Sequence, residues 1–66
     1  MSLVRLRRGG FVLVSWRGDH APRHVHVYRD GELVLKWDLD ERKPMWGRVT
    51  RRLMNLIEAL ESEESL

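Results

Sequence analysis

All three histidines of the chain lie within one stretch of seven residues, and this stretch is the part of the sequence best suited to chemistry. His24 and His26 are separated by one residue in a segment rich in β-forming side chains, so both rings project from the same face of a predicted strand. Neighbouring side chains on one face of a strand lie about 6.5–7 Å apart, which lets two imidazoles contact one ligand. His20 comes from the preceding turn, which Pro22 marks, and could join them.

A pair of histidines can act as acid and base, because imidazole titrates near neutral pH. The side chains expected to hold phosphate or nucleic acid beside them are Arg23, Tyr28, Arg29 and Lys36. The three cations among these would stabilise the negative charge that builds in a transition state. Together the residues provide the parts of a metal-independent ribonuclease, with His24 and His26 as the catalytic pair and His20 assisting. The same parts also form a phosphate-binding patch without catalysis, and the sequence does not separate the two.

Two other interpretations of the histidines remain open. Spaced as H-x-x-x-H-x-H, His20, His24 and His26 could supply three ligands of an open zinc site, and imidazole also suits nickel and copper. Neighbouring cations disfavour a metal ion, so we expect no cofactor. The histidines could also be polar residues on the solvent face of a strand, without any chemical role.

The length of 66 residues predicts a single small domain that spans residues 1–66. A chain this short buries little of its surface, so a partner subunit would add stability, and a homodimer is one option. The lack of cysteine excludes disulfides and thiolate metal sites and is typical of a cytoplasmic protein. No apolar run approaches the roughly 18 residues that a membrane helix needs, so we expect no membrane partner.

The net charge of +2 excludes a polycation, but the charges are unevenly distributed. Ten of the twelve basic residues are arginine, whose planar guanidinium suits phosphate and carboxylate groups. Acidic residues gather near the C-terminus: Glu58, Glu61, Glu63 and Glu64. The chain is therefore bipolar. The arginine content fits a nucleic-acid partner, and it fits equally a genome that favours arginine and ion pairs.

The hydrophobic pattern predicts an α+β fold, with a small antiparallel sheet of three to four strands and one C-terminal helix packed on one face. The predicted strands cover about residues 3–7, 11–16, 24–29 and 32–38, and the predicted helix covers about 48–62. The apolar stripe of this helix consists of Val49, Leu53, Leu56, Ile57 and Leu60. Thr50 is the nearest good capping side chain, with Gly47 as the other candidate. Residues 39–47 contain Pro44 and are expected to be a connection.

The alternation of side chains in the predicted hairpin favours one register. A three-residue loop with a bulge at Gly31 gives two clean faces, whereas a two-residue loop without a bulge mixes them. One face then carries the apolar residues Val25, Val27, Leu33, Leu35 and Trp37. The opposite face carries the polar residues His24, His26, Tyr28, Lys36 and Asp38. We expect the helix to cover the apolar face and to leave the histidine face open.

Residues 19–28 read D-H-A-P-R-H-V-H-V-Y, and Asp30-Gly31-Glu32 and a helix after Gly47 follow. From about Phe11 to Leu60, the chain resembles family 4160 of the small bacterial domains of unknown function, whose hallmark is D-H-x-P-x-H-x-H followed by a hairpin and a helix. The residues that match the hallmark are Asp19, His20, Pro22, His24 and His26. Many members have a second proline where this chain has Arg23. The resemblance implies one component of a toxin–antitoxin module, encoded beside a small partner protein.

Residues and resemblance together predict a small prokaryotic module of toxin–antitoxin type that binds RNA, and could cleave it, through a histidine-lined sheet face. The first alternative is a non-enzymatic protein-interaction module that uses the open face or an edge strand. The second alternative is the histidine metal site.

Overall fold

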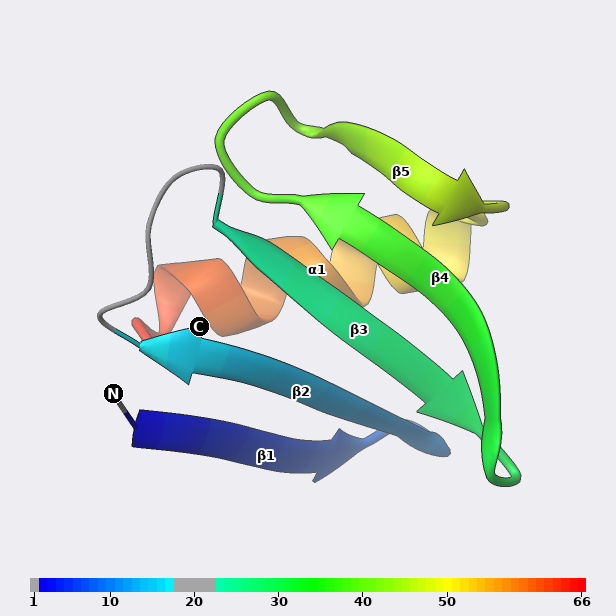
Figure 1. The fold of residues 1–66 in the computed structure, drawn as a ribbon, viewed down its shortest axis with the longest axis horizontal. Helices are drawn as coiled ribbons and strands as arrows, with labels where there is room; N and C mark the ends of the chain where they lie inside the picture. The colour runs from blue at the N-terminus through cyan, green and yellow to red at the C-terminus, as the bar shows by residue number, and fades with distance from the viewer. Residues whose placement is uncertain (1, 18–22) are drawn as a thin grey trace.

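The computed structural model describes residues 2–17 and 23–66, which form one antiparallel sheet and one helix (Figure 1). The sheet has five strands in the order β1-β2-β3-β4-β5. The elements are β1 (Ser2–Arg8), β2 (Phe11–Arg17), β3 (His24–Arg29), β4 (Glu32–Asp38), β5 (Lys43–Gly47) and α1 (Arg51–Ser62). The predicted α+β class and antiparallel sheet are confirmed, whereas the predicted three to four strands are too few. Asp19, His20 and Pro22 lie outside the described residues.

The β3–β4 hairpin places the histidines and Lys36 on one face as predicted, but its turn and register differ from the prediction. Asp30 and Gly31 both have positive φ, 52° and 79°, and form a two-residue turn between Arg29 and Glu32. Positive φ at both central residues is typical of the tight turn that matches the twist of a hairpin. The extra residue is Val34, because Val27 pairs with Leu35 and Tyr28 pairs with Leu33. The prediction of a three-residue loop with its bulge at Gly31 is therefore wrong.

The displaced bulge changes which side chain enters the core. Val34 packs against the buried cluster, and Leu33 instead pairs with Tyr28. Leu33 was predicted on the apolar face, and this expectation is wrong because the bulge reverses the alternation after Leu33. Beyond the bulge, Val25 pairs with Trp37 and His26 with Lys36, as the amphipathic register requires.

Strand β5 replaces the connection that was expected over residues 39–47. It pairs with β4 from Leu35 opposite Gly47 to Asp38 opposite Lys43, with an irregularity at Met45. Pro44 is compatible with this position because β5 is an edge strand, whose outer side needs no ladder hydrogen bonds. All five residues of β5 are exposed, so no alternation of buried and exposed side chains marked it in the sequence.

Helix α1 packs on one face of the sheet, as Figure 1 shows. Leu53, Ile57 and Leu60 join a single buried cluster with side chains from β2, β3 and β4. The strand residues of this cluster are Phe11, Leu13, Val25, Val27, Leu35 and Trp37. The helix begins at Arg51, and the Thr50 hydroxyl accepts a hydrogen bond from the Leu53 amide at 3.2 Å, so Thr50 is the cap. Within the described part of the chain, no helix has the length and apolar character that crossing a membrane requires.

Candidate functional site

The sheet face opposite α1, called the open face below, carries side chains from all five strands. Because side chains opposite each other on paired strands share a face, the register identifies its members. One row crosses the whole sheet: Arg5, Val14, His26, Lys36 and Trp46. A second row contains Arg7, Val12, Tyr28 and Leu33. The predicted grouping of His24, His26, Tyr28 and Lys36 on one face agrees with this register.

The two histidine rings lie close together at the centre of the open face. Their centroids are 5.2 Å apart, and the ring planes are tilted by 52°. The His26 ring also meets the Trp16 ring edge to face, with centroids 5.8 Å apart. Both histidines are half-buried, so each ring has packed neighbours and a solvent-facing edge.

The surroundings of His26 favour its neutral form. Partial burial lowers the pKa of the His26 imidazole below its usual 6.5, and the positive charges of His24 and Lys36 lower it further. A neutral imidazole at pH 7 has an unprotonated ring nitrogen that can accept a proton. The Lys36 ammonium, opposite His26 in the register, provides a positive charge for an anion bound at the same place.

Two cations predicted to hold phosphate are engaged elsewhere. The Arg23 Nε atom donates to Asp40 Oδ1 at 3.1 Å, and the Arg23 amide donates to Asp40 Oδ2 at 2.9 Å. The Arg29 guanidinium carbon lies 5.7 Å from the centre of the Phe11 ring, which belongs to the core on the helix side of the sheet. The structure therefore does not bring Arg29 to the histidine pair, and it binds Arg23 to a carboxylate.

Asp38 lies on the histidine side of β4 opposite His24, but its carboxylate is bound to backbone amides. It is only 5% exposed, and its Oδ1 atom accepts hydrogen bonds from the amides of Asp40 and Glu41, both at 2.9 Å. These bonds hold the turn between β4 and β5. Asp38 therefore positions the edge strand that carries Trp46.

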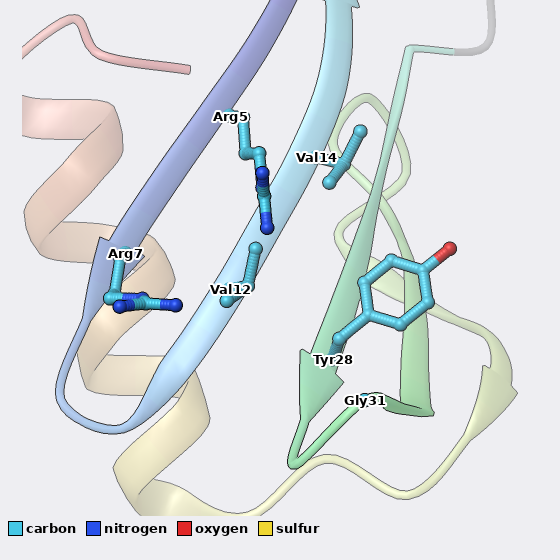
Figure 2. Close-up of a pocket in the computed structure, with 6 residues that line it drawn as sticks. All are labelled: Arg5, Arg7, Val12, Val14, Tyr28 and Gly31. Atoms are coloured by element: carbon cyan, nitrogen blue, oxygen red, sulfur yellow. The ribbon is translucent and has the colours of Figure 1, made fainter.

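A hollow of about 480 Å³ lies on the open face beside the histidine pair (Figure 2). Its lining comes from β1, β2, β3 and the β3–β4 turn: Arg5, Arg7, Val12, Val14, Tyr28 and Gly31. Only Tyr28 was predicted as a site residue. The alternation of Leu3, Arg5 and Arg7 in the sequence does place the two arginines on one side of a strand. It does not say which face of the sheet that side joins.

Residues 2–17 and 23–66 contain no group of three or more His, Cys, Asp or Glu side chains that could hold a metal ion. The set proposed from the sequence includes His20, which is outside these residues. His24 and His26 alone supply two imidazoles.

Comparisons with known proteins give no match: no protein family, no curated protein and no solved structure is similar enough to this chain. The resemblance of residues 19–28 to family 4160 therefore stays a prediction.

Proposed function

We propose that this protein is a small RNA-binding module that holds a single-stranded RNA on its open face. The observation that supports it best is the central histidine pair, which has an aromatic ring on one side and a cation on the other. The rings of His24 and His26 are 5.2 Å apart, Trp16 contacts His26, and Lys36 is opposite it on the next strand.

The rest of the open face has the two features that single-stranded nucleic acids bind. Exposed aromatic rings stack on bases, and Trp16 is 40% exposed and Trp46 54% exposed. Positive side chains contact the phosphates, and the row from β1 to β5 begins with Arg5 and includes Lys36. Lys36 and Trp46 are neighbours in this row and Trp16 contacts His26, so bases and phosphates of one strand can be held together.

Cleavage of the bound strand is the reaction that the histidine pair suits. Neutral His26 would take the proton of a ribose 2′-hydroxyl, whose oxygen attacks the adjacent phosphorus. As the 2′-oxygen–phosphorus bond forms, the bond from phosphorus to the 5′-oxygen breaks, and protonated His24 gives that oxygen a proton. The products are a 2′,3′-cyclic phosphate and a 5′-hydroxyl. Lys36 would stabilise the charge on the phosphoryl oxygens in the transition state.

The biological setting follows from the resemblance of the histidine motif. We propose a cytoplasmic component of a toxin–antitoxin-type module, encoded alongside a small partner protein that controls its access to RNA. An RNA substrate implies a cytoplasmic location. The open face is exposed in the free protein, so a partner that covers this face would block access to RNA.

A protein-interaction module without RNA is the second candidate, and β5 favours it. This edge strand exposes Met45 by 50% and Trp46 by 54%, which is unusual for large apolar side chains next to unpaired backbone groups. A second copy or the partner protein could pair with this edge. Sedimentation of the protein alone and with the partner, with no RNA present, tests this candidate.

The binding test uses a fluorescent twelve-base RNA of mixed sequence and measures anisotropy between about 50 and 200 mM salt. If Arg5, Arg7 and Lys36 each neutralise one phosphate, the logarithm of affinity falls with the logarithm of salt with a slope of about −2. Lys36→Gln should reduce this slope by about 0.7. Arg51→Gln, which makes the same change of charge on the helix, should leave it unchanged. Equal slopes for both variants, or no binding by the wild type, would contradict the proposal.

The cleavage test incubates the same RNA with a chelator present and separates the products on a gel. Cleavage by the wild type with a cyclic phosphate product, and its loss in His24→Gln and His26→Gln with RNA binding retained, would support the acid–base pair. A DNA strand of the same sequence lacks the 2′-hydroxyl and should bind but stay intact. If RNA binds and neither strand is cleaved, the face is a binding surface only.

A further inference from the structure

The hollow beside the histidine pair contains two arginines that form no ion pair with residues 2–17 and 23–66. Arg5 and Arg7 alternate along β1 and lie on the same face, and Figure 2 shows both guanidinium groups directed over β2 toward Val12. Neither forms a hydrogen bond or ion pair with the described part of the chain. Arg8, the next residue, contrasts with them, because it pairs with Glu63 at 2.6 Å. Within the described residues, the two guanidiniums are therefore available to bind an anion at one side of the hollow.

The remainder of the hollow is apolar and aromatic. Val12 and Val14 of β2 form its floor, and the Tyr28 ring stands on β3 at the side away from the arginines (Figure 2). Gly31 has no side chain and leaves the end at the β3–β4 turn unobstructed. The volume of about 480 Å³ is within the range of about 300–1,000 Å³ that small-molecule sites occupy. A suitable ligand thus combines an anionic group with a flat ring.

We propose that this hollow is a binding site for one phosphorylated nucleotide. The phosphate lies between the Arg5 and Arg7 guanidiniums, whose donors match phosphate oxygens in pairs. The base lies over the two valines and against the Tyr28 ring, because every base has a face that stacks on an aromatic side chain.

The position of the hollow also gives the path of a bound strand, and this part rests on the proposed function. Val14 lies between Arg5 and His26 in one row of the sheet, so Arg5 and His26 are two strands, or about 10 Å, apart. A nucleotide in the hollow therefore places the next phosphodiester of the same strand over His26 and His24. The hollow would fix the register of the RNA at the site of cleavage.

The test of the hollow compares 5′-AMP, adenosine and inorganic phosphate by NMR titration of the wild-type protein. We expect 5′-AMP to shift the Tyr28 ring and the Val12 and Val14 methyl signals, and to bind at least about tenfold more tightly than adenosine or phosphate. Equal and weak binding of all three probes would overturn the proposal. A glutamate-rich peptide that displaces 5′-AMP at similar concentration would also overturn it, because the site would then recognise acidic groups in general.

Four variants separate the parts of the site, and the folded state of each is checked from its amide NMR spectrum. Arg5→Gln and Arg7→Gln should each weaken 5′-AMP binding about tenfold and leave adenosine binding unchanged. Tyr28→Leu should weaken 5′-AMP and adenosine binding but not phosphate binding. Arg51→Gln, on the helix, should bind all three like the wild type. Normal 5′-AMP binding by Arg5→Gln or Arg7→Gln would contradict the assignment of the phosphate.

The source of the nucleotide and the proposed function are tested together with RNA. A 5′-phosphorylated RNA that binds more tightly than its 5′-hydroxyl form would identify a strand end in the hollow, and equal binding with loss in Arg5→Gln would identify an internal nucleotide. RNA binding that is equal in the wild type, Arg5→Gln and Arg7→Gln would refute the hollow and confine the proposed RNA-binding face to the histidine pair, Lys36 and the tryptophans. Normal 5′-AMP binding without RNA binding would refute the proposed function and leave a site for free nucleotides.

Discussion

The His26 imidazole meets the Trp16 indole edge to face, with ring centroids 5.8 Å apart and planes at 79°. The indole covers part of the imidazole, and burial is the largest cause of the lowered pKa of His26. One contact therefore joins the two properties that the proposed function needs. Trp16 provides an exposed aromatic surface for a base, and it helps to keep the adjacent imidazole neutral and able to accept a proton.

The pKa of His26 should depend on Lys36, which lies opposite it on β4. The cation of Lys36 disfavours a second positive charge, so Lys36→Gln should raise the pKa of His26 toward 6.5. His24→Gln should raise it as well, because the charge of His24 acts in the same direction. Histidine-resolved NMR titration measures both changes, with Arg51→Gln as the control. An unchanged His26 pKa in both variants would show that charge on the open face has no influence on the ring.

The lowered pKa of His26 also predicts how stability changes with pH. Between its folded pKa and the unfolded value near 6.5, the unfolded chain binds a proton on His26 more readily than the folded chain does. Folding stability therefore decreases as the pH falls through this interval. His26→Gln removes the contribution, so the difference in stability between the wild type and His26→Gln should change from pH 7 to pH 5. Urea unfolding at several pH values measures it, and a constant difference would contradict the pKa shift.

The amphipathic pattern of the β3–β4 hairpin was enough to predict which side chains surround the histidines, but not how the chain turns. A three-residue loop with a bulge at Gly31, and a two-residue turn with a bulge at Val34, both place His26 and Lys36 on the same face, but only the second pairs them directly. The two solutions differ in whether Leu33 or Val34 faces the core. Because both side chains are apolar, the pattern could not distinguish them. The backbone preferences of the turn residues decided between the two solutions, because Asp30 and Gly31 both accept positive φ.

Two other parts of the structure were not predictable from one sequence. Strand β5 has no buried face and contains Pro44, so its only signal is the backbone pairing with β4.

The contribution of Arg5 and Arg7 to the site depends on the register between β2 and β3. A slip of one residue there would move both arginines to the helix side, and the long link between these strands does not fix the register.

Gly47 is predicted to tolerate substitution less well than Gly9. It has a φ of 89°, and a Cβ atom there would meet the Val34 carbonyl oxygen of the neighbouring strand. Gly47→Ala should therefore lower the free energy of unfolding by about 2 kcal/mol or more. Gly9 has a φ of 61° with no atom within 4 Å of the added carbon, so Gly9→Ala should cost only about 1 kcal/mol. Urea unfolding of both variants checks the order, and equal costs would show that the contact with Val34 is relieved easily.

Asp38 is predicted to hold the edge of the open face through its buried carboxylate. Asp38→Ala removes both hydrogen bonds to the amides of Asp40 and Glu41, and should cost about 3 kcal/mol. A chain of this length has a total stability of about 3–10 kcal/mol, so this variant could be largely unfolded. Asp38→Asn keeps a neutral acceptor oxygen and should cost about half as much, measured by urea unfolding. In the folded Asn variant, we expect the Trp46 indole signal to shift while the Phe11 ring signals stay in place. A shift of both, or of neither, would mean that Asp38 does not act on β5 in particular.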